Sequence, residues 1–185
     1  MTFERENKIK NVLNKRQLDL TVVMENVNDP HNISAVLRTC DATGIHEIHI
    51  IDTQELHEFK KLGKKSSASA VKWVKKRYYT DVKSCITKLK ADGFLIYATH
   101  LSEKSIPLYD IDFTRKIALV FGNEKEGVSE EMAAQSDINF KIPQIGMIPS
   151  LNISVACAVT LYEAFRQRSL KGFYEKENVS LLTFE

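Results

Sequence analysis

The sequence is poor in the residues that mark several classes of protein. Its 185 residues include three cysteines, far apart and without a Cys-x-x-Cys pair. That count argues against a disulfide framework or a zinc ribbon and favours a reducing cytosol. No apolar run approaches the roughly 20 residues of a membrane span, and the first residues form no hydrophobic signal core. We therefore expect a cytoplasmic protein that is not secreted and does not bind membranes.

The chain also lacks a large excess of charge of either sign, since its formal net charge is only +2. A nucleic-acid-binding role must therefore come from clustering of charge. Residues 60–77 contain eight basic side chains and no acidic one. A solvated face and a phosphate-binding surface both remain open for this segment. Two further basic groups lie in residues 4–17 and at Arg166, Arg168 and Lys171. We favour RNA or DNA over a membrane as the partner.

Short apolar segments alternate with helical ones along the chain. The pattern predicts strands at 20–24, 46–52, 94–98, 117–121 and 138–142, and helices at 32–43, 82–92, 152–168 and from Ser129. This alternation predicts an α/β fold with an open, mostly parallel sheet covered by helices on both faces. Ligands of such sheets bind beyond the carboxyl ends of the strands. We divide the chain into a basic N-terminal helix (1–17), one α/β domain (18–168) and a C-terminal tail (169–185).

A glycine-rich segment, Gly122–Ser129, follows one predicted strand and precedes a helix. It nearly fits the phosphate loop G-x-x-x-x-G-K-[ST], but Val128 stands where that loop has lysine, and two glutamates inside it would repel phosphate. A nucleotide hydrolase is therefore disfavoured. A plain turn would explain the glycines but not Glu124.

Three other features bear on chemistry. In residues 143–152, Ser150 and Asn152 are both helix-capping types, and the helix that follows is apolar nearly all round, as expected of a core or a subunit interface. Asn32, a good N-cap, and Arg38 lie not quite two turns apart, which puts them on roughly similar sides; a solvent-exposed arginine is the alternative. His46 and His49 face opposite ways on a strand, which argues against a shared metal.

Three ordered segments together resemble the TrmH family of the SPOUT superfamily of RNA methyltransferases. They are Asn32–Arg38, Leu119–Gly127 and Ile142–Ala156. The resemblance continues at residues 16–26, 72–74 and 162–168, so it covers nearly the whole chain. Pro149 is a small departure, at a position where a polar residue is expected.

The resemblance implies a C-terminal deep trefoil knot that holds S-adenosylmethionine, and a homodimer in which the first motif of one subunit meets the knot of the other. It implies no metal. The implied cofactor-binding residues are Thr99, Gly122, Ile142 and Leu151. The implied catalytic and RNA-binding residues are Asn32, Arg38, Glu124, Ser150 and Asn152.

The implied reaction is 2′-O-methylation of guanosine 18 in the D-loop of tRNA. The alternatives are another RNA such as rRNA, or a non-catalytic RNA-binding protein on the same fold. Many rRNA members carry an extra N-terminal RNA-binding domain, and here only a short helix precedes the first strand, which favours tRNA. The family proposal makes Arg38 the general base, but an arginine with a pKa above ~12 is a poor base. We prefer Arg38 as the holder of a neighbouring phosphate, with that phosphate or a water accepting the proton.

Overall fold

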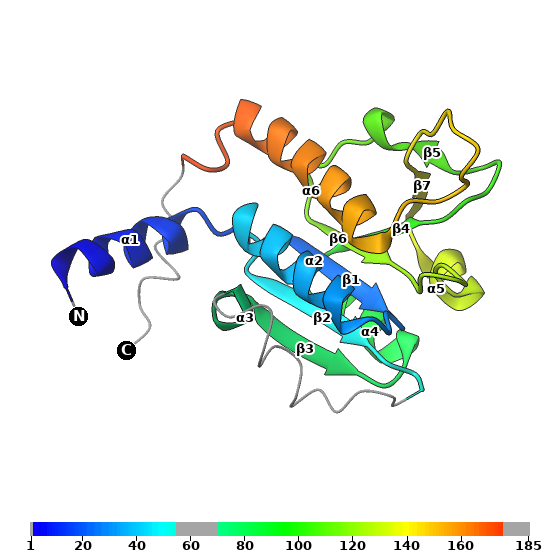
Figure 1. Ribbon diagram of the computed structural model, residues 1–185, viewed down its shortest axis with the longest axis horizontal. Helices are drawn as coiled ribbons and strands as arrows, with labels where there is room; N and C mark the ends of the chain where they lie inside the picture. Colours follow the sequence, from blue (N-terminus) through cyan, green and yellow to red (C-terminus); the bar gives the residue numbers. More distant parts are fainter. Residues whose placement is uncertain (1, 55–69, 176–185) are drawn as a thin grey trace.

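The computed structural model describes residues 2–54 and 70–175, which form a twisted sheet with helices packed on it (Figure 1). In chain order the elements are α1 (Phe3–Asn14), β1 (Leu20–Glu25), α2 (Pro30–Ala42), β2 (Glu47–Ile51), α3 (Ala70–Trp73), β3 (Lys75–Tyr79), α4 (Val82–Ala91), β4 (Leu95–Thr99), β5 (Ile106–Pro107), a short 3-10 helix η2 (Leu108–Asp110), β6 (Ile117–Phe121), α5 (Glu130–Gln135), β7 (Ile138–Lys141) and α6 (Ile153–Leu170).

The seven strands lie in the order β3-β2-β1-β6-β4-β7-β5, and each neighbouring pair is parallel. Successive residues of a strand point to opposite faces, so Val22 and Met24 face one layer of core and Val23 faces the other. Helices α2 and α6 cover the first face, and α4 and α5 cover the second. The predicted parallel sheet with helices on both faces is confirmed.

The helix predicted from Asn32 begins two residues earlier than expected. Asp29 is the N-cap of α2, where its side chain accepts a hydrogen bond from the amide of His31, and Pro30 occupies the first turn. Proline is favoured there because the backbone N–H groups of the first turn have no partner within the helix, so the absence of one N–H loses no helical hydrogen bond. Asn32 is therefore the third residue of α2 and not its N-cap, and its side-chain amide makes contacts outside the helix.

Two strands were not predicted, β3 and β5. The β3 sequence Lys-Lys-Arg-Tyr-Tyr lies at one edge of the sheet beside β2, and an edge strand needs no continuous apolar run. Strand β5 at the other edge has only two residues. Arg77 of β3 donates a 2.6 Å hydrogen bond to the Glu47 carboxylate. The basic residues at 60–65 lie outside the described residues.

The basic group predicted at Arg166, Arg168 and Lys171 is not a surface cluster. Arg168 is fully buried and donates to the carbonyl oxygens of Phe113 and Arg115 and to the Asp19 carboxylate. Arg166 pairs with Glu163 on the same helix. Of this predicted basic patch, Arg168 belongs to the core, while Arg166 and Lys171 remain exposed.

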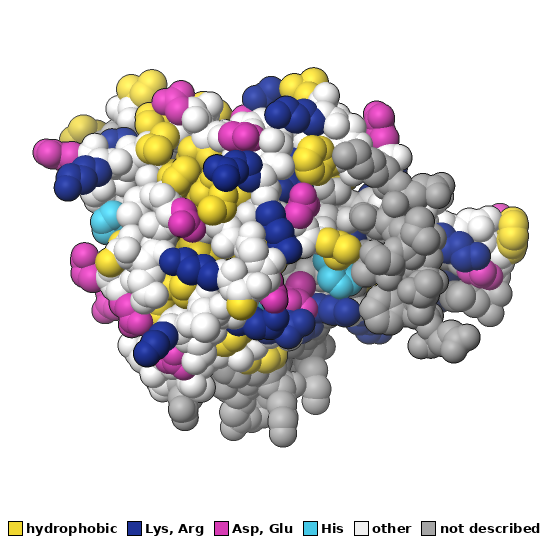
Figure 2. All heavy atoms as spheres, turned by 180° about the vertical axis from the view of Figure 1, so that it is seen from behind, with side chains coloured by type: hydrophobic (Ala, Val, Ile, Leu, Met, Phe, Trp, Pro, Cys, Tyr) yellow, Lys and Arg dark blue, Asp and Glu magenta, His cyan; other side chains and the backbone are white. Residues whose placement is uncertain are grey.

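The two ends of the described chain differ in how they attach to the body. Helix α1 projects from it and contains no buried residue (Figures 1 and 2). Residues 169–175, assigned above to the tail, extend α6 to Leu170 and then fold back, so that the Tyr174 hydroxyl donates to the Thr43 carbonyl at 2.9 Å.

Figure 2 shows basic and acidic side chains interspersed over the face opposite α2 and α6. No helix within residues 2–54 and 70–175 is long and apolar enough to cross a membrane.

Candidate active site

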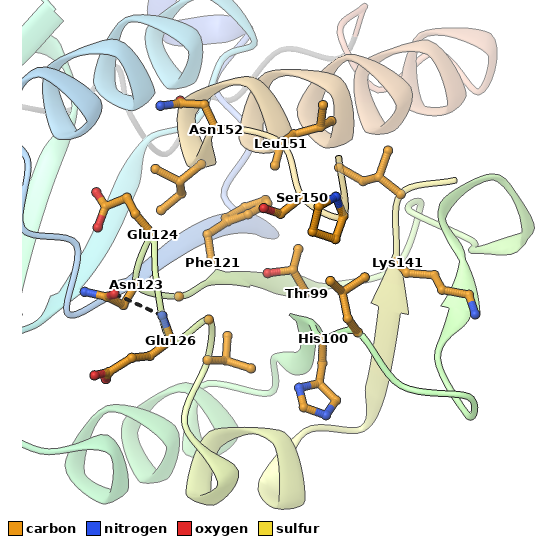
Figure 3. A pocket seen from close by; sticks show the side chains of 18 of the residues that line it. Thr99, His100, Phe121, Asn123, Glu124, Glu126, Lys141, Ser150, Leu151 and Asn152 are labelled. Atoms are coloured by element: carbon orange, nitrogen blue, oxygen red, sulfur yellow. Dashed lines mark hydrogen bonds between the residues drawn. The ribbon is translucent and has the colours of Figure 1, made fainter. Parts of the chain in front are cut away.

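A cavity of about 540 Å³ opens at the carboxyl ends of β4, β6 and β7 (Figure 3). Its walls come from the three segments that follow these strands, including Thr99–Leu101, Phe121–Val128 and Ser150–Ile153. This is the edge of the sheet at which a parallel α/β fold is expected to bind ligands. Its volume is within the range of pockets for drug-sized molecules and cofactors.

The four residues predicted to bind a cofactor, Thr99, Gly122, Ile142 and Leu151, all line this cavity. The Thr99 hydroxyl donates to the Val120 carbonyl at 3.1 Å, which ties β4 to β6 at the cavity floor. A Cβ atom on Gly122 would lie 2.1 Å from the carbonyl carbon of Gly127. Only glycine therefore allows the segment 122–127 to close on itself, which the paired 2.9 Å hydrogen bonds between Asn123 and Gly127 accomplish.

A chain of hydrogen bonds joins the three segments that carried the family resemblance. The Asn32 amide donates to the Glu124 carboxylate at 3.0 Å, and the Asn152 amide donates to Asn32 Oδ1 at 3.1 Å. Asn152 Oδ1 in turn accepts from the backbone amide of Ser154 at 2.8 Å, as the N-cap of α6. Asn32 is buried, so water cannot readily substitute for its two partners. The chain fixes the start of α6 against the loop that follows β6.

The remaining two predicted residues are placed differently. Ser150 lines the cavity, and in Figure 3 its side chain lies between Phe121 and Leu151. Arg38 is exposed and does not line the cavity of its own chain. The expectation that Arg38 and Asn32 share a side of the helix is wrong, because six positions at roughly 100° each leave them about 120° apart.

Residues that the sequence did not single out complete the walls, among them His100, Phe121 and Lys141. Each directly follows or ends a strand whose carboxyl end faces the cavity. Figure 3 shows His100 and Lys141 on the side of the cavity away from Glu124 and Asn152. Position at a strand end is the signal that could have identified them.

Buried titratable groups outside the cavity are not poised for chemistry. The three cysteines are buried and unpaired, and burial raises the pKa of Cys85 to about 12, which leaves no nucleophilic thiolate there. Burial lowers the pKa of His49 to about 4, and its Nδ1 lies 3.1 Å from the Tyr79 hydroxyl. Within the described ranges, no three His, Cys, Asp or Glu side chains gather in a way that could hold a metal.

Comparison with known proteins defines the class to which this site belongs. Residues 19–162 match the SpoU rRNA Methylase family. The chain therefore belongs to this family of RNA methyltransferases, and the family predicted from the three motifs is confirmed.

Individual relatives are similar over most of their length. The chain is 46% identical over 176 residues to the tRNA (guanosine(18)-2′-O)-methyltransferase of Thermus thermophilus, covering 95% of this chain and 89% of that protein. It is 41% identical over 181 residues to the protein of that name from Escherichia coli, covering 98% and 78%. The crystal structure of the A. aeolicus TrmH/SpoU tRNA modifying enzyme superposes with a TM-score of 0.87 at 38% identity, covering 95% and 88%. An AdoMet-bound rRNA methyltransferase from Sinorhizobium meliloti gives 0.73 at 27% identity, covering 84% and 59%.

Proposed function

We propose that this protein transfers a methyl group from S-adenosylmethionine to the 2′-hydroxyl of guanosine 18 in the D-loop of tRNA. The observation that carries the proposal is that Glu124 and Asn152, which line one cavity, are joined through the buried Asn32, so that three distant segments meet there. The Thermus thermophilus and Escherichia coli relatives, at 46% and 41% identity, bear the name of this activity. We further propose that it works in the cytoplasm, where it would meet tRNA.

The cavity fits the cofactor in size and chemistry. Phe121, Ile142 and Leu151 offer apolar walls suited to an adenine ring, and Thr99 lies in the same wall. The carboxylates of Glu124 and Glu126 on one side favour a cationic centre, and Lys141 on another side favours a carboxylate. When bound, S-adenosylmethionine supplies an electrophilic methyl group on a sulfonium.

In this proposal the chain's own residues position the acceptor and accommodate its proton. The O–CH₃ bond forms as the S–CH₃ bond breaks, and the hydroxyl proton must leave the ribose. Ser150 and Asn152 hold the ribose by hydrogen bonds at the cavity rim. Glu124 fixes the orientation of Asn32 and of the loop it belongs to. No chain residue needs to be the base if a phosphate or a water accepts the proton.

We propose that Arg38 serves the cavity of a second copy of the chain, in a homodimer. Its exposure on α2 leaves it available to a partner. A second surface supports a dimer: Ile145 and Met147 are fully exposed at 105% and 100%, and Tyr162 on the outer side of α6 is 54% exposed. Exposed large apolar side chains at this density favour association. The apolar character of α6 is then explained by a core on one side and a partner on the other.

The same proposal includes a deep trefoil knot formed by the segment from β7 to α6. The loops after β6 and β7 share the walls of one cavity, and β7 pairs with β4 rather than with β6. Such an arrangement supports threading of the last segment through an earlier loop. Tracing the chain in a crystal structure tests this part of the proposal, and a segment from β7 to α6 that passes through no earlier loop would contradict it.

The function is tested by transfer of labelled methyl from S-adenosylmethionine to an unmodified tRNA transcript. The matched control is the same tRNA with 2′-deoxyguanosine at position 18, which keeps the base and removes only the acceptor hydroxyl. Label on the first and none on the second supports the proposal. Label on both moves the target to another nucleotide. Label on rRNA alone, or cofactor binding without transfer to any RNA, contradicts it in favour of a relative with another substrate or a non-catalytic binder.

The role of Arg38 is tested by Arg38→Lys, which keeps the charge and loses the fork that grips a phosphate with two hydrogen bonds. We expect activity to fall by at least about tenfold. Near-full activity in Arg38→Lys would show that a point charge suffices and would exclude the two-pronged phosphate contact.

A further inference from the structure

The loop that follows β6 carries Glu124 as an exposed carboxylate, yet the backbone around it is tightly fixed. Asn123 Oδ1 accepts hydrogen bonds from the amides of Lys125 at 2.8 Å and Glu126 at 3.2 Å. The Asn123 backbone also exchanges two hydrogen bonds with Gly127. One side chain therefore sets the path of the chain immediately before and after Glu124, as Figure 3 shows for Asn123 and Glu126.

The same loop is held from outside by the end of β1. Asn123 Nδ2 donates to the Asn26 carbonyl at 2.8 Å, which anchors the start of the loop. Glu25 Oε2 accepts from the amide of Ser129 at 3.0 Å, which anchors its end. Two consecutive residues, the last of β1 and the one that follows it, thus hold both ends of one loop that lies 104 and 97 positions away in sequence.

The backbone conformation of Asn26 and its contact with Thr53 fix the position of the Asn26 carbonyl that accepts from Asn123. Asn26 adopts a left-handed backbone conformation, with φ of 52°, and its side chain accepts hydrogen bonds from the amide and hydroxyl of Thr53. Asparagine tolerates that conformation better than most residues. The turn of the chain at Asn26 directs its carbonyl toward Asn123, and Thr53 holds the turn.

From this geometry we infer that Asn123 is a positioning residue, clamped by Asn26 in a loop whose far end Glu25 holds through Ser129, and that it places the Glu124 carboxylate against Asn32. The inference rests on the proposed function, in which Glu124 belongs to the active site. Asn123 acts through Glu124 because its hydrogen bonds fix the backbone on either side of that residue. The Asn32 amide donates to the Glu124 carboxylate placed in this way, at 3.0 Å, and Asn32 Oδ1 accepts from Asn152, so that the position of Glu124 also bears on Asn152.

The test separates the two ends of the Asn123 side chain. Asn123→Asp keeps the oxygen that accepts from Lys125 and Glu126 but loses the donor to Asn26. Asn123→Ala loses both. Asn139→Ala is a matched control, because Asn139 Nδ2 also donates to a backbone carbonyl, that of Ala133 at 3.0 Å, away from the loop. Glu124→Ala supplies the background for a double-mutant cycle.

We expect Asn123→Asp to lower kcat by about tenfold, the range set by loss of one hydrogen bond, with KM for tRNA changed less than about twofold. In the Glu124→Ala background the same substitution should change kcat by less than about twofold, because the residue it positions is already gone. Asn139→Ala should lower the melting temperature as much as Asn123→Asp does and leave kcat unchanged. Additive effects of Asn123→Asp and Glu124→Ala would overturn the inference.

A readout independent of catalysis distinguishes failure of this inference from failure of the proposed function. Amide hydrogen exchange in Asn123→Ala should quicken at Lys125 and Glu126 by at least about tenfold and stay unchanged in β4. If the wild-type protein methylates no tRNA but the exchange changes as expected, the proposed function fails and the clamp stands. If exchange is unaltered in Asn123→Ala, the clamp is wrong whatever the activity.

Discussion

The two loops that wall the cavity are built in opposite ways. The loop at 122–129 is closed by backbone hydrogen bonds, filled by the Asn123 side chain and held at its two ends by Asn26 and Glu25. The loop at 142–152 has a single internal side-chain hydrogen bond, from Gln144 to the Pro149 carbonyl at 3.4 Å, among those described. Its apolar residues Ile145, Met147 and Ile148 point to solvent at 105%, 100% and 71% exposure.

The difference indicates how each loop obtains its shape. The first is determined within one chain, so its conformation exists before any ligand or partner arrives. The second presents apolar surface that the single chain does not cover, so its conformation depends on what packs on it. Asn32 joins them, since it contacts Glu124 in the first and Asn152 at the end of the second.

We expect the largest loss of methyl transfer when the contact between Asn32 and Glu124 is removed. Asn32→Asp is nearly isosteric but replaces the donor to Glu124 with a second carboxylate at hydrogen-bond distance. We expect methyl transfer to fall by at least about 100-fold, since a buried donor is lost and like charges meet. Steady-state kcat and KM measure it. Asn28→Asp adds the same charge at an exposed position near the start of α2 and should stay within about twofold; comparable losses in both variants would mean that charge alone, not the contact, is responsible.

A matched pair of glycine substitutions compares the loops directly. Gly122→Ala would bring a Cβ to 2.1–2.2 Å from the backbone of Gly127 and Val128, whereas a Cβ on Gly146 meets nothing within 4 Å. We expect Gly122→Ala to cost about 1–3 kcal/mol in the free energy of unfolding, and Gly146→Ala to stay within about 0.5 kcal/mol. Chemical denaturation measures both. Equal costs would show that the second loop is as constrained as the first.

Removing the exposed apolar residues tests the outer loop. Replacing Ile145, Met147 and Ile148 together with serine should raise the dissociation constant of the proposed homodimer by at least about tenfold and leave the secondary structure of the monomer intact. Light scattering over a dilution series measures it. The control is Phe3→Ser on α1, another strongly exposed apolar residue at 78%. An unchanged dimer in the triple variant would assign these residues to another contact.

The smallest effect concerns Glu25 under the inner loop. Its Oε1 has no hydrogen-bond partner among the described residues, and burial raises the pKa of this carboxyl above its ordinary 4.5. A raised pKa in the folded state means that Glu25 favours folding below about pH 4.5 and weakens it as the pH rises through the folded-state pKa. Glu25→Gln should therefore add about 1 kcal/mol at pH 7, since it removes a buried charge and keeps an acceptor for Ser129.

Denaturant titrations between pH 4 and pH 8 check this sign. The gain from Glu25→Gln should shrink as the pH falls, whereas Glu103→Gln, at an exposed position, should show no such trend. Destabilisation by Glu25→Gln at pH 7 would mean that the ionised contact with Ser129 outweighs the cost of burial.

The sequence predicted the sheet because its central strands are buried on both faces and therefore read as apolar runs, as in Ile117–Phe121. It could not predict β3, whose exposed edge position tolerates Lys and Arg. Arg168 shows the converse: a basic residue predicted to lie at the surface is buried, because carbonyl groups from distant segments surround it.

The candidate site was predictable as a set of residues but not as a geometry. Motif spacing indicated Asn32, Glu124 and Asn152, yet only the packing of α2 against α6 and against the loop after β6 brings them within hydrogen-bond distance. Arg38 illustrates the limit, since the helix turns it away from Asn32 and out of its own chain's cavity. Asn123 lies inside the Leu119–Gly127 motif, but the sequence alone assigned it no role, because its contact with Asn26 joins residues 97 positions apart.

The buried Arg168 has a consequence for the order of folding. Its guanidinium bonds to Asp19, near the start of β1, and to Phe113 and Arg115 just before β6, so the contact spans 149 residues of chain. Until Arg168 leaves the ribosome, the carbonyls and carboxylate that it satisfies remain without their cation and one face of the sheet lacks α6. Contacts of such long sequence separation form late and slow the folding of a chain. The core of the nascent protein therefore stays open on one side until α6 has been synthesised and Arg168 makes these contacts.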